Sequence, residues 1–525
     1  MKGLQKWSTI WLAPLLFESS FARPTQQPLV SPSHASIRAA NYTNFELRRY
    51  GISSREDLVH MVNLVNQANI DVWHLTPSHV DVHMDTTADL PESLAHRRYT
   101  TLPHSFPYNY NYTSIPLNRL NIDLSSLEDN EFHRAYHTYE EIDQFVVALA
   151  SQYPKLVEVV WLGASWEKRD VFALRIGRRG RGNHKKGNKR KKHNHLWTDN
   201  PAQESEPLIA PLYHYVKSLI RGLAESSGLV TPRKPITIRD LYSPSASHEI
   251  TQSHPIKNRI VIQGAQHARE ASTATALYLA HALVAPNNET GSLRHLLDDF
   301  DFTIIPVPNP DGYEYTWTTD RLWYKNRMEF ESEAPKFADC KGVDMNRNWG
   351  YQWNSSGDGL SDPEDPCSHW YPGAYPFQAP EVIAIANYIR RTPEIRAFLD
   401  LRSYGQMLMY PYSYTCGSVP PHAEDIIEAA LGATKALREK HGMHYTSGAS
   451  CELLYPAPGN IIDWMYADAN VIFSYSLMLR DAGTYGFLLP PRQIQPVGEE
   501  TAAAVKYLAK FIEDVSSCLA PAHGC

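Results

Sequence analysis

Hydrophobic positions in this chain form short apolar runs and longer amphipathic stretches, which alternate from about residue 136 to residue 401. Short runs rich in Val, Ile and Phe predict buried strands, and longer stretches with apolar residues three or four apart predict helices. Such alternation favours an α/β fold in which a mixed, largely parallel twisted sheet has helices on both faces. The predicted strands cover residues 157–162, 171–176, 259–264, 302–307 and 397–401, and the predicted helices include residues 272–284 and 380–390.

A smaller α/β unit is predicted nearer the N-terminus. Residues 54–65 have the capping and spacing of a helix, and residues 71–75 and 80–84 have the pattern of strands. Residues 23 to about 45 are rich in Pro, Ser, Thr and Gln and are expected to be disordered. A polar stretch from about residue 87 to residue 131 is expected to connect this unit to the larger one.

His267 and Glu270 lie three residues apart, between the strand predicted at 259–264 and the helix predicted at 272–284. Imidazole nitrogen and carboxylate oxygen are both zinc ligands, so a pair at such a junction can address one metal ion. In a chain with 23 histidines, however, most pairs of this kind are surface coincidences. The pair therefore needs support from other motifs.

That support comes from five segments further along the chain. They are Asp320–Lys325, Val343–Trp349, Asp400–Gln406, Tyr455 with Gly459–Trp464, and Leu479–Pro490. In this order and spacing the series closely resembles the zinc metallocarboxypeptidases of the carboxypeptidase A and B type, over roughly residues 134–517. The resemblance is specific because several independent motifs agree.

The resemblance implies a role for each matched residue. An apolar residue at position 462 implies a preference for apolar C-terminal residues. The implied zinc ligands are His267 and Glu270, and the residue implied to polarise the scissile carbonyl is Arg269. The substrate's C-terminal carboxylate would be bound by Asn346 and Arg347. Tyr455 matches the tyrosine that closes over bound substrate, and Ile462 matches the residue that selects the substrate side chain.

Three matched positions depart from the family pattern. Arg402 stands where the third zinc ligand, a histidine, is expected, and Ser403 after it belongs to the implied substrate-binding set. Met478 stands where the general-base glutamate is expected, and Tyr324 stands where an arginine would stabilise the oxyanion. With these changes the catalytic set is not intact.

Each change has a physical cost. A guanidinium has no lone pair to offer a metal, and a cation about 4 Å from a dication is repelled by several kcal/mol even at an effective dielectric constant of about 20. Loss of a positioned general base removes about two to four decades of rate, and loss of one oxyanion donor can cost about a hundredfold. The three defects affect the metal, the base and the oxyanion together.

A shifted alignment is the competing interpretation. Because alternate strand residues face opposite sides, a shift by one residue at Met478 would bring in Leu477 or Leu479, and neither can act as a base. Asp400 shares a face with Arg402 and remains a substitute ligand in this interpretation, but a displacement of two residues places it nearly 7 Å away.

Two function hypotheses follow. The first is an inactive carboxypeptidase-like protein that keeps a scaffold and part of a peptide groove, similar to a fungal branch of the family that is secreted or vacuolar and linked to cell-wall organisation. In that branch the zinc ligands are usually kept, so Arg402 departs even from it. The alternative is an active zinc carboxypeptidase with a rebuilt site that prefers apolar C-terminal residues. Zinc is thus implied by the family but expected to be weakly bound or absent here.

Composition adds localisation. The chain has 525 residues, 43% of them hydrophobic, and a net charge of −7, which names no partner and predicts no nucleic-acid binding. Residues 1–22 have a basic start, a short apolar stretch and a small-residue end, which is typical of a cleaved signal peptide. No other apolar stretch has the roughly 18 residues of a membrane span. We expect a soluble secreted or vacuolar protein.

Cysteines and sequons fit an exported protein. Six cysteines predict disulfides. The family resemblance implies a bond between Cys340 and Cys367, and a bond between Cys416 and Cys451 would join the loops around Tyr455. Cys518 and Cys525 are either paired or free. The sequons, each of which could also be unused, are at Asn41, Asn111, Asn288 and Asn354.

The predicted organisation is a signal peptide at 1–22, a pro-segment at 23–131, a metallocarboxypeptidase-like domain at 132–517 and a tail at 518–525. In the family, the pro-domain covers the cleft until proteolysis, and Arg97-Arg98 offers a site for the cut. A basic insertion at about 177–234 does not fit the family. Its run at 178–192 is either a solvated loop or a patch that binds polyanions.

Two expectations concern the site itself. Arg402 is expected to pair with Glu270 and to fill the place of zinc, because a buried carboxylate without a metal needs a counter-charge. Recognition of peptide C-termini is expected to outlast catalysis, because Asn346, Arg347 and Tyr455 address the terminal carboxylate rather than the scissile bond.

Overall fold

In the computed structural model, the strands of the described residues form two sheets, one of four strands and one of eight. The residues described are 44–68, 70–88, 90–102, 122–128, 130–178, 257–330, 340–355 and 363–518. The expected signal peptide, the sites at Asn41 and Asn111, residues 179–192 of the basic run and Cys525 lie outside these residues.

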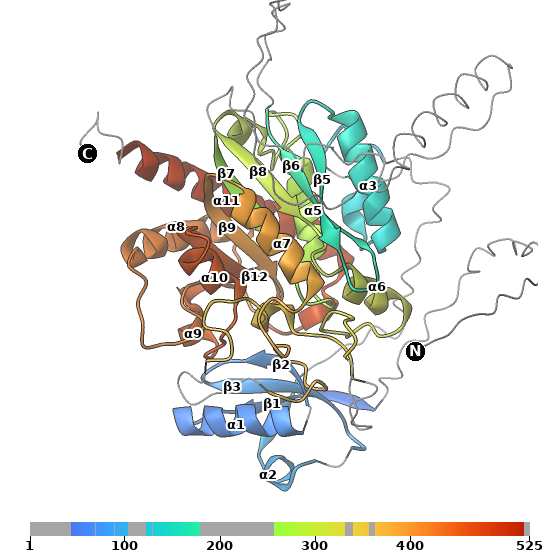
Figure 1. Ribbon diagram of the computed structural model, residues 1–525, viewed down its shortest axis with the longest axis vertical. Coiled ribbons are helices and arrows are strands. Elements are labelled where there is room, and N and C mark those ends of the chain that lie inside the picture. Colours follow the sequence, from blue (N-terminus) through green and yellow to red (C-terminus); the bar gives the residue numbers. More distant parts are fainter. Residues whose placement is uncertain are drawn as a thin grey trace, which may run out of the picture. The chain divides into compact units, whose positions relative to one another are not determined.

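The larger sheet is mixed and largely parallel, as expected (Figure 1). Its strand order is β11-β10-β12-β9-β7-β8-β6-β5. Parallel pairs join β11 to β10, β12 to β9, β9 to β7 and β7 to β8, and the other neighbours are antiparallel. The strands are β5 Val157–Ala164, β6 Asp170–Ile176, β7 Asn258–Gln263, β8 Phe300–Ile305, β9 Ile395–Arg402, β10 Met407–Tyr410, β11 Thr446–Ala449 and β12 Phe473–Met478.

Helices cover both faces of this sheet. In β7, Ile260 and Ile262 enter one apolar cluster, whereas Val261 between them enters another. This alternation is expected when both faces of a parallel strand are buried. The helices of this part are α3 Tyr139–Gln152, α5 Ser272–Ala282, α6 Pro310–Thr318, α7 Pro380–Arg391, α8 Ala423–His441, α9 Ser450–Leu453, α10 Ile461–Ala467 and α11 Ile494–Cys518.

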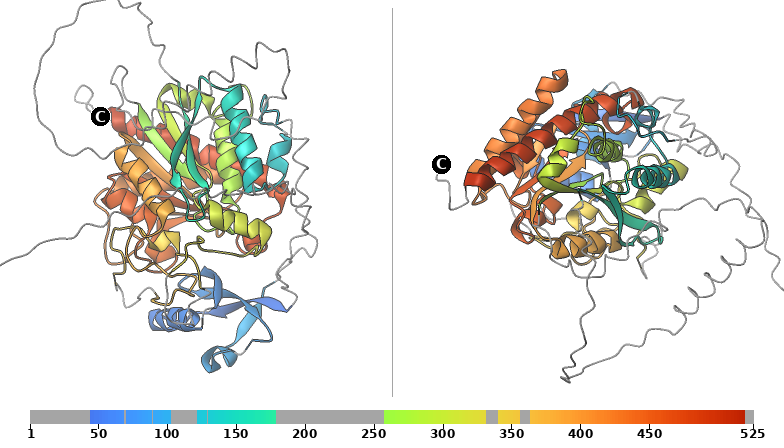
Figure 2. Two further views of the ribbon diagram at one scale, coloured as in Figure 1. Left: turned by 45° about the vertical axis from the view of Figure 1, so that its right-hand side comes forward. Right: turned by 90° about the horizontal axis from the view of Figure 1, so that it is seen from above.

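The two apolar clusters divide the helices between the faces. Helices α3, α5, α8 and α11 contribute to the first cluster, and α7 and α10 contribute to the second. Helices α8 and α11 lie side by side in the view from above (Figure 2, right). Helix α8 ends where Gly442 adopts a positive φ of 76°, a conformation that glycine takes at little cost.

The smaller sheet has the antiparallel order β2-β3-β1-β4. Ser54 caps α1 by accepting a hydrogen bond from the Asp57 N–H (3.2 Å), and apolar residues of α1, such as Met61, pack on the sheet. The elements are β1 Phe45–Gly51, α1 Arg55–Gln67, β2 Asp71–Leu75, β3 His79–Asp85, α2 Glu92–Ala95 and β4 Tyr99–Thr101.

Three elements of the smaller unit were not predicted. Strand β1 begins at Phe45, where the stretch expected to be disordered ends, and α2 and β4 lie within the expected connector. Charged residues hide β1 in the sequence, although Leu47 and Tyr50 are buried. Its order comes from pairing with β3 on one side and β4 on the other. Arg97, at the expected cut, instead donates to the Asp57 carboxylate (2.6 and 2.7 Å).

Both expected disulfides are formed, with Cα–Cα distances of 4.9 Å for Cys340–Cys367 and 5.3 Å for Cys416–Cys451. Of the sequons within the described residues, Asn288 and Asn354 are both exposed.

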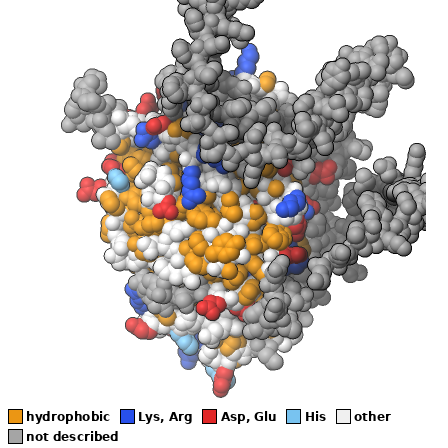
Figure 3. All heavy atoms as spheres, in the orientation of Figure 1, with side chains coloured by type: hydrophobic (Ala, Val, Ile, Leu, Met, Phe, Trp, Pro, Cys, Tyr) orange, Lys and Arg blue, Asp and Glu red, His pale blue; other side chains and the backbone are white. Residues whose placement is uncertain are grey.

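Hydrophobic side chains gather on the face over α7 (Figure 3), where Ile383 is exposed. In the described part of the chain, none of the helices has the length and apolar character needed to cross a membrane.

Candidate functional site

The residues singled out in the sequence converge at one end of the larger sheet. His267, Arg269 and Glu270 lie in the turn between β7 and α5, Arg402 ends β9, and Met478 ends β12. Strands β9 and β12 are paired in parallel, and Met478 lies directly opposite Arg402 in this pairing. Ligands in α/β sheets bind outside the carboxyl ends of parallel strands, and this is where the residues meet.

His267 is held through both ring nitrogens. Its Nε2 lies 2.7 Å from the Oδ1 of Asp344, which precedes the short 3₁₀ helix Met345–Arg347. Burial opposes ionisation of Asp344, but His267 and Arg347 outweigh it and lower the pKa of Asp344 to about 2. A carboxylate behind an imidazole fixes its orientation. The Nδ1 atom therefore points away from Asp344, toward Glu270 and Arg402.

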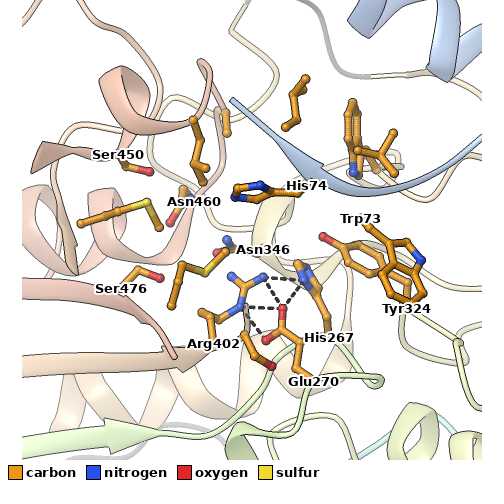
Figure 4. A pocket seen from close by; sticks show the side chains of 18 of the residues that line it. Trp73, His74, His267, Glu270, Tyr324, Asn346, Arg402, Ser450, Asn460 and Ser476 are labelled. Atoms are coloured by element: carbon orange, nitrogen blue, oxygen red, sulfur yellow. Dashed lines mark hydrogen bonds and ion pairs between the residues drawn. The ribbon is translucent and has the colours of Figure 1, made fainter. Parts of the chain in front are cut away.

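The Arg402 guanidinium contacts both Glu270 and His267 (Figure 4). Its Nε donates to Glu270 Oε2 (2.9 Å) and Oε1 (3.1 Å), and its Nη2 donates to Oε1 (2.9 Å). The same Nη2 contacts His267 Nδ1. Because a guanidinium can only donate, Nδ1 accepts this bond with its lone pair. The ion pair expected between Arg402 and Glu270 is confirmed.

This arrangement does not fit zinc. The metal would need the lone pair of His267 Nδ1 and the carboxylate of Glu270, and Arg402 already binds both. Burial would raise the pKa of Glu270, but Arg402 outweighs it and lowers that pKa. Although burial disfavours the charged form of Arg402, Glu270 and Asp400 raise its pKa well above the ordinary value. Both groups therefore stay charged, and the buried pair takes the place of a metal centre.

Asp400 does not act as a substitute ligand in this arrangement. Its oxygens accept hydrogen bonds from Gln263 Nε2 (3.2 Å) and Gln266 Nε2 (3.1 Å), and Arg402 Nη1 lies 3.5 Å away. Burial raises the pKa of Asp400 to about 6, even though Arg402 opposes that rise. Asp400 thus belongs to an amide network behind Arg402.

Tyr324 fills the expected oxyanion position with an aromatic ring. Its ring centroid lies 3.7 Å from that of His267, and the Arg269 guanidinium lies over the Tyr324 ring, 4.8 Å from its centroid. Burial raises the pKa of Tyr324 well above the ordinary value. The phenol therefore stays neutral and brings no positive charge to the site.

Arg269 is held by the smaller sheet. It donates to the Asp71 carboxylate (2.7 Å) and to the backbone carbonyl of Val72 (3.0 Å), both in β2. Burial opposes ionisation of Asp71, but Arg269 outweighs it and lowers the Asp71 pKa. In this state the guanidinium expected to polarise a scissile carbonyl is engaged by β2.

The three residues expected to bind a terminal carboxylate lie together. Arg347 Nη2 donates to the Tyr455 hydroxyl (2.6 Å), and the Tyr455 ring stacks on Trp370 with a centroid distance of 5.4 Å. The Asn346 side-chain oxygen accepts from the Ile461 N–H (3.1 Å). Ser403, also in the expected set, accepts a hydrogen bond from the Ala271 N–H (3.2 Å).

These residues surround a cavity of about 90 Å³. Strand β2 forms part of its wall with Val72, Trp73, His74 and Leu75. In Figure 4, His74 lies across the cavity from His267 and Arg402. Since a cavity of about 10–15 Å³ already holds one water, this one has room for several waters or a small side chain.

The selector expected at Ile462 is not part of this wall. Ile462 is completely buried and packs into the apolar cluster of α7 and α10. The side of the cavity away from β2 instead combines polar and apolar residues, among them Ser413, Ser450, Asn460, Ser476, Met409 and Leu454. The start of α10 turns the Ile462 side chain into the core.

Sequence reasoning missed several residues that shape the site. Asp344 lies within the motif Val343–Trp349, and a lone acidic residue in such a segment is a signal that could have identified it. Asp71, Trp73 and His74 carry no such signal, because nothing local shows that β2 lies against residues about 200 positions away.

Comparison with known proteins now places the chain among characterised families. A family profile described as zinc carboxypeptidase matches residues 142–504. Relatives include the inactive metallocarboxypeptidase ECM14 of Uncinocarpus reesii, which is 29% identical over 97% of this chain and 82% of that protein. The protein of the same name from Ajellomyces dermatitidis is 30% identical over 93% of this chain and 75% of that protein.

Solved structures give the same fold. The crystal structure of thrombin-activatable fibrinolysis inhibitor is 26% identical, with a TM-score of 0.62 over 90% of this chain and 99% of that chain. Carboxypeptidase A from Helicoverpa armigera has a TM-score of 0.63 over 91% of this chain and 99% of that chain. At 21% identity, the second likeness concerns the fold alone.

Proposed function

Because this chain belongs to the zinc carboxypeptidase family, we propose that it is a member that has lost hydrolysis and retains the scaffold. The observation that carries this proposal is the Arg402 guanidinium, which binds Glu270 and His267 where a metal would need them. The relatives named inactive metallocarboxypeptidases support it.

The other replacements point in the same direction. Met478, opposite Arg402 in the sheet, has no proton to transfer, and Tyr324 is a neutral ring where positive charge would be needed. A positioned base is worth about two to four decades in rate, and one oxyanion donor can be worth a further hundredfold. Zinc binding at this place is therefore absent, and hydrolysis is not sustained.

The test compares the parent protein with Arg402→His in zinc-containing buffer. We expect neither protein to release C-terminal residues from peptides, and we expect Arg402→His to bind one more zinc ion per chain than the parent. The control for a contaminating peptidase is Arg347→Ala. Hydrolysis by the parent that disappears in Arg347→Ala would overturn the proposal.

The retained function is recognition of free peptide C-termini. Arg347 and Tyr455 are placed together at the cavity, and a charge-assisted contact with a carboxylate is worth roughly 1.5–3 kcal/mol. An apolar side chain at the cavity adds about as much. The sum corresponds to a dissociation constant on the order of millimolar to tens of micromolar.

Calorimetric titration with a short peptide and its C-terminally amidated twin tests this recognition. The free acid is expected to bind more tightly, and Arg347→Ala is expected to remove the difference. Arg396→Ala serves as the matched control, because Arg396 is an exposed arginine paired with Glu394. Equal affinity for the two peptides would mean that the groove no longer recognises C-termini.

The biological setting proposed is the secretory pathway. Residues 1–22 act as a signal peptide, residues 23–131 as a pro-segment, residues 132–517 as the carboxypeptidase-like domain and residues 518–525 as a tail. The product is secreted or vacuolar, is glycosylated at some of its four sequons, and contributes to cell-wall organisation. Sequencing the N-terminus of the exported protein, with and without endoglycosidase treatment, tests the first part, and sensitivity of a deletion strain to wall stress tests the second.

The basic run at 178–192 is proposed to bind polyanions. Its first residue, Arg178, pairs with Asp298 (2.7 Å). A protein whose Lys185, Lys186, Lys189, Arg190, Lys191 and Lys192 are changed to Ser should elute from heparin resin at lower salt than the parent. Unchanged elution would identify the run as a solvated loop.

A further inference from the structure

A polar cluster in the smaller sheet shares His74 with the cavity wall but lies apart from His267, Glu270 and Arg402. His74 is the last residue but one of β2 and is the direct cross-strand partner of Asp81 in β3. His79 lies two residues before Asp81, so the two side chains share a face of β3. One ligand atom from each of the three residues can be chosen so that all lie within 4.8 Å of one another.

The hydrogen bonding of this cluster is incomplete. Both ring nitrogens of His74 and the Nε2 of His79 are buried without a partner among the described residues. The same holds for the hydroxyl of Tyr404 from the larger unit, whose ring lies 5.5 Å from that of His74. Buried polar groups normally have partners. Four unsatisfied atoms on neighbouring rings make this place suited to binding a ligand.

The ligand set selects the kind of species. Two imidazoles and one carboxylate are donors for zinc, copper or nickel ions. The Nδ1 of His79 already lies 3.0 Å from the Thr76 hydroxyl, so its Nε2 is the atom left for a ligand. A hydrogen bond at one ring nitrogen and a metal at the other is the usual arrangement of a ligating histidine.

We propose that His74, His79 and Asp81 bind one divalent transition-metal ion of the zinc or copper type. A tetrahedral zinc ion with bonds of about 2.0–2.1 Å holds its ligand atoms about 3.4 Å apart. The cluster must therefore contract by about 1.4 Å from its widest separation. The fourth position is left for water, which the Tyr404 hydroxyl can contact.

Arg49 is expected to weaken the binding of the metal ion by Asp81. It donates to both Asp81 oxygens, at 2.7 and 2.6 Å. A carboxylate has about four lone-pair sites, so Asp81 can still ligate through one of them. The nearby guanidinium repels the ion, and this site is consequently weaker than one with an unpaired carboxylate.

The proposed ion would tie β2 to β3 at the cavity wall. His74 and its neighbours in β2 line the cavity, and His79 opens β3. A ligand that binds only the folded hairpin stabilises it. Metal binding would thus strengthen the strand that holds Arg269, without using either of the family's ligand residues.

The experiment titrates the tag-free full chain, after chelation and dialysis, with Co²⁺ and follows its visible absorption bands. The parent is expected to bind one Co²⁺ per chain, displaced by Zn²⁺. His79→Asn keeps an amide near the Nδ1 position but removes Nε2. His74→Leu removes a buried group that lacks partners, so the metal-free variant should unfold at the same or a higher temperature.

Both variants are expected to bind Co²⁺ at least tenfold more weakly than the parent. His60→Asn is the matched control, because His60 is an exposed histidine of α1 outside the cluster, and it should bind as the parent does. No Co²⁺ bands in the parent, or unchanged binding in His74→Leu and His79→Asn, would overturn the proposal. If His74→Leu still bound zinc, the zinc would lie at His267 and Glu270, which would contradict the exclusion of zinc by Arg402. The metal-site proposal and the proposed loss of hydrolysis therefore fail on different results.

Discussion

Arg402 carries a fixed positive charge to the end of β9, beside a histidine and a glutamate whose spacing suits a metal. A guanidinium satisfies the buried Glu270 through several hydrogen bonds at once, which a bidentate donor does better than a lysine. The cost is that two charges are desolvated. Such a pair is not a strong source of stability, but breaking it leaves an uncompensated buried charge.

Removing one partner should therefore be costly, and removing both should not. We expect Arg402→Met to lower the free energy of unfolding by about 3–5 kcal/mol, whereas the double variant Arg402→Met, Glu270→Met should be close to the parent. Urea unfolding of the four proteins in the cycle measures the coupling. The exposed Arg396→Met is the control and should change little. Additive losses in the double variant would contradict the pairing.

A buried carboxyl beside the cavity predicts a pH dependence. Asp463 accepts hydrogen bonds from the Ser413 and Tyr414 N–H groups (2.8 Å each), yet burial outweighs them and raises its pKa to about 7. A raised carboxyl pKa gives stability that is full below the unfolded value of about 3.9 and is lost as the pH rises through about 7.

The measurement compares the parent with Asp463→Asn at about pH 4 and about pH 8. Since each pKa unit corresponds to about 1.4 kcal/mol, the parent should lose on the order of 4 kcal/mol relative to the variant over this range. A difference in unfolding free energy that stays constant with pH would show that Asp463 is ionised throughout.

Among the elements, β2 has the largest effect on the site. Its Asp71 and Val72 bind Arg269, and Trp73 packs edge-on against Phe487 with a centroid distance of 5.2 Å. Leu47, Leu322 and Tyr404 complete this apolar contact. The strand thus closes the cavity with polar bonds at one end and aromatic packing in the middle.

Trp73→Ala should loosen β2 selectively. A buried Trp-to-Ala change costs about 3–5 kcal/mol, which corresponds to at least about a hundredfold faster amide exchange in β2. Hydrogen–deuterium exchange should show this change in residues 71–75 and little change in β7 and β9, and peptide acids should bind more tightly. Trp161→Ala is the control, since Trp161 is 46% exposed. Equal acceleration in both sheets would indicate global destabilisation instead.

The family's metal, base and oxyanion positions come from different elements of the molecule, and an active enzyme needs all three for one reaction. Groups that act as a unit show strongly non-additive effects. Arg402→His or Met478→Glu alone should therefore give almost no peptidase activity. The triple variant with Tyr324→Arg should release C-terminal residues from a blocked dipeptide in zinc buffer, most readily when Trp73→Ala opens the cavity. Clear activity from Met478→Glu alone would contradict three independent defects.

The agreement between sequence and structure is greatest where the determining interactions are local. Helices α5 and α7 and the strands at the site were predicted within a few residues from their hydrophobic spacing. The ion pair of Arg402 with Glu270 was also predictable, because the matched motifs placed both at strand ends and electrostatics required a counter-charge. Most of the residues that meet at the site were therefore predicted from the family motifs.

The sequence by itself determined the α/β class, the order of the site motifs and the three replacements, because these depend on residue identity and short-range periodicity. Tertiary structure decided the rest. Strand β1 is ordered by pairing with β3, Ile462 turns into the core, and Arg269 is held by Asp71 across a separation of 198 residues. His74, His79 and Asp81 also become a cluster only when β2 and β3 pair in one register. Such contacts depend on which surfaces meet, and no local pattern records that.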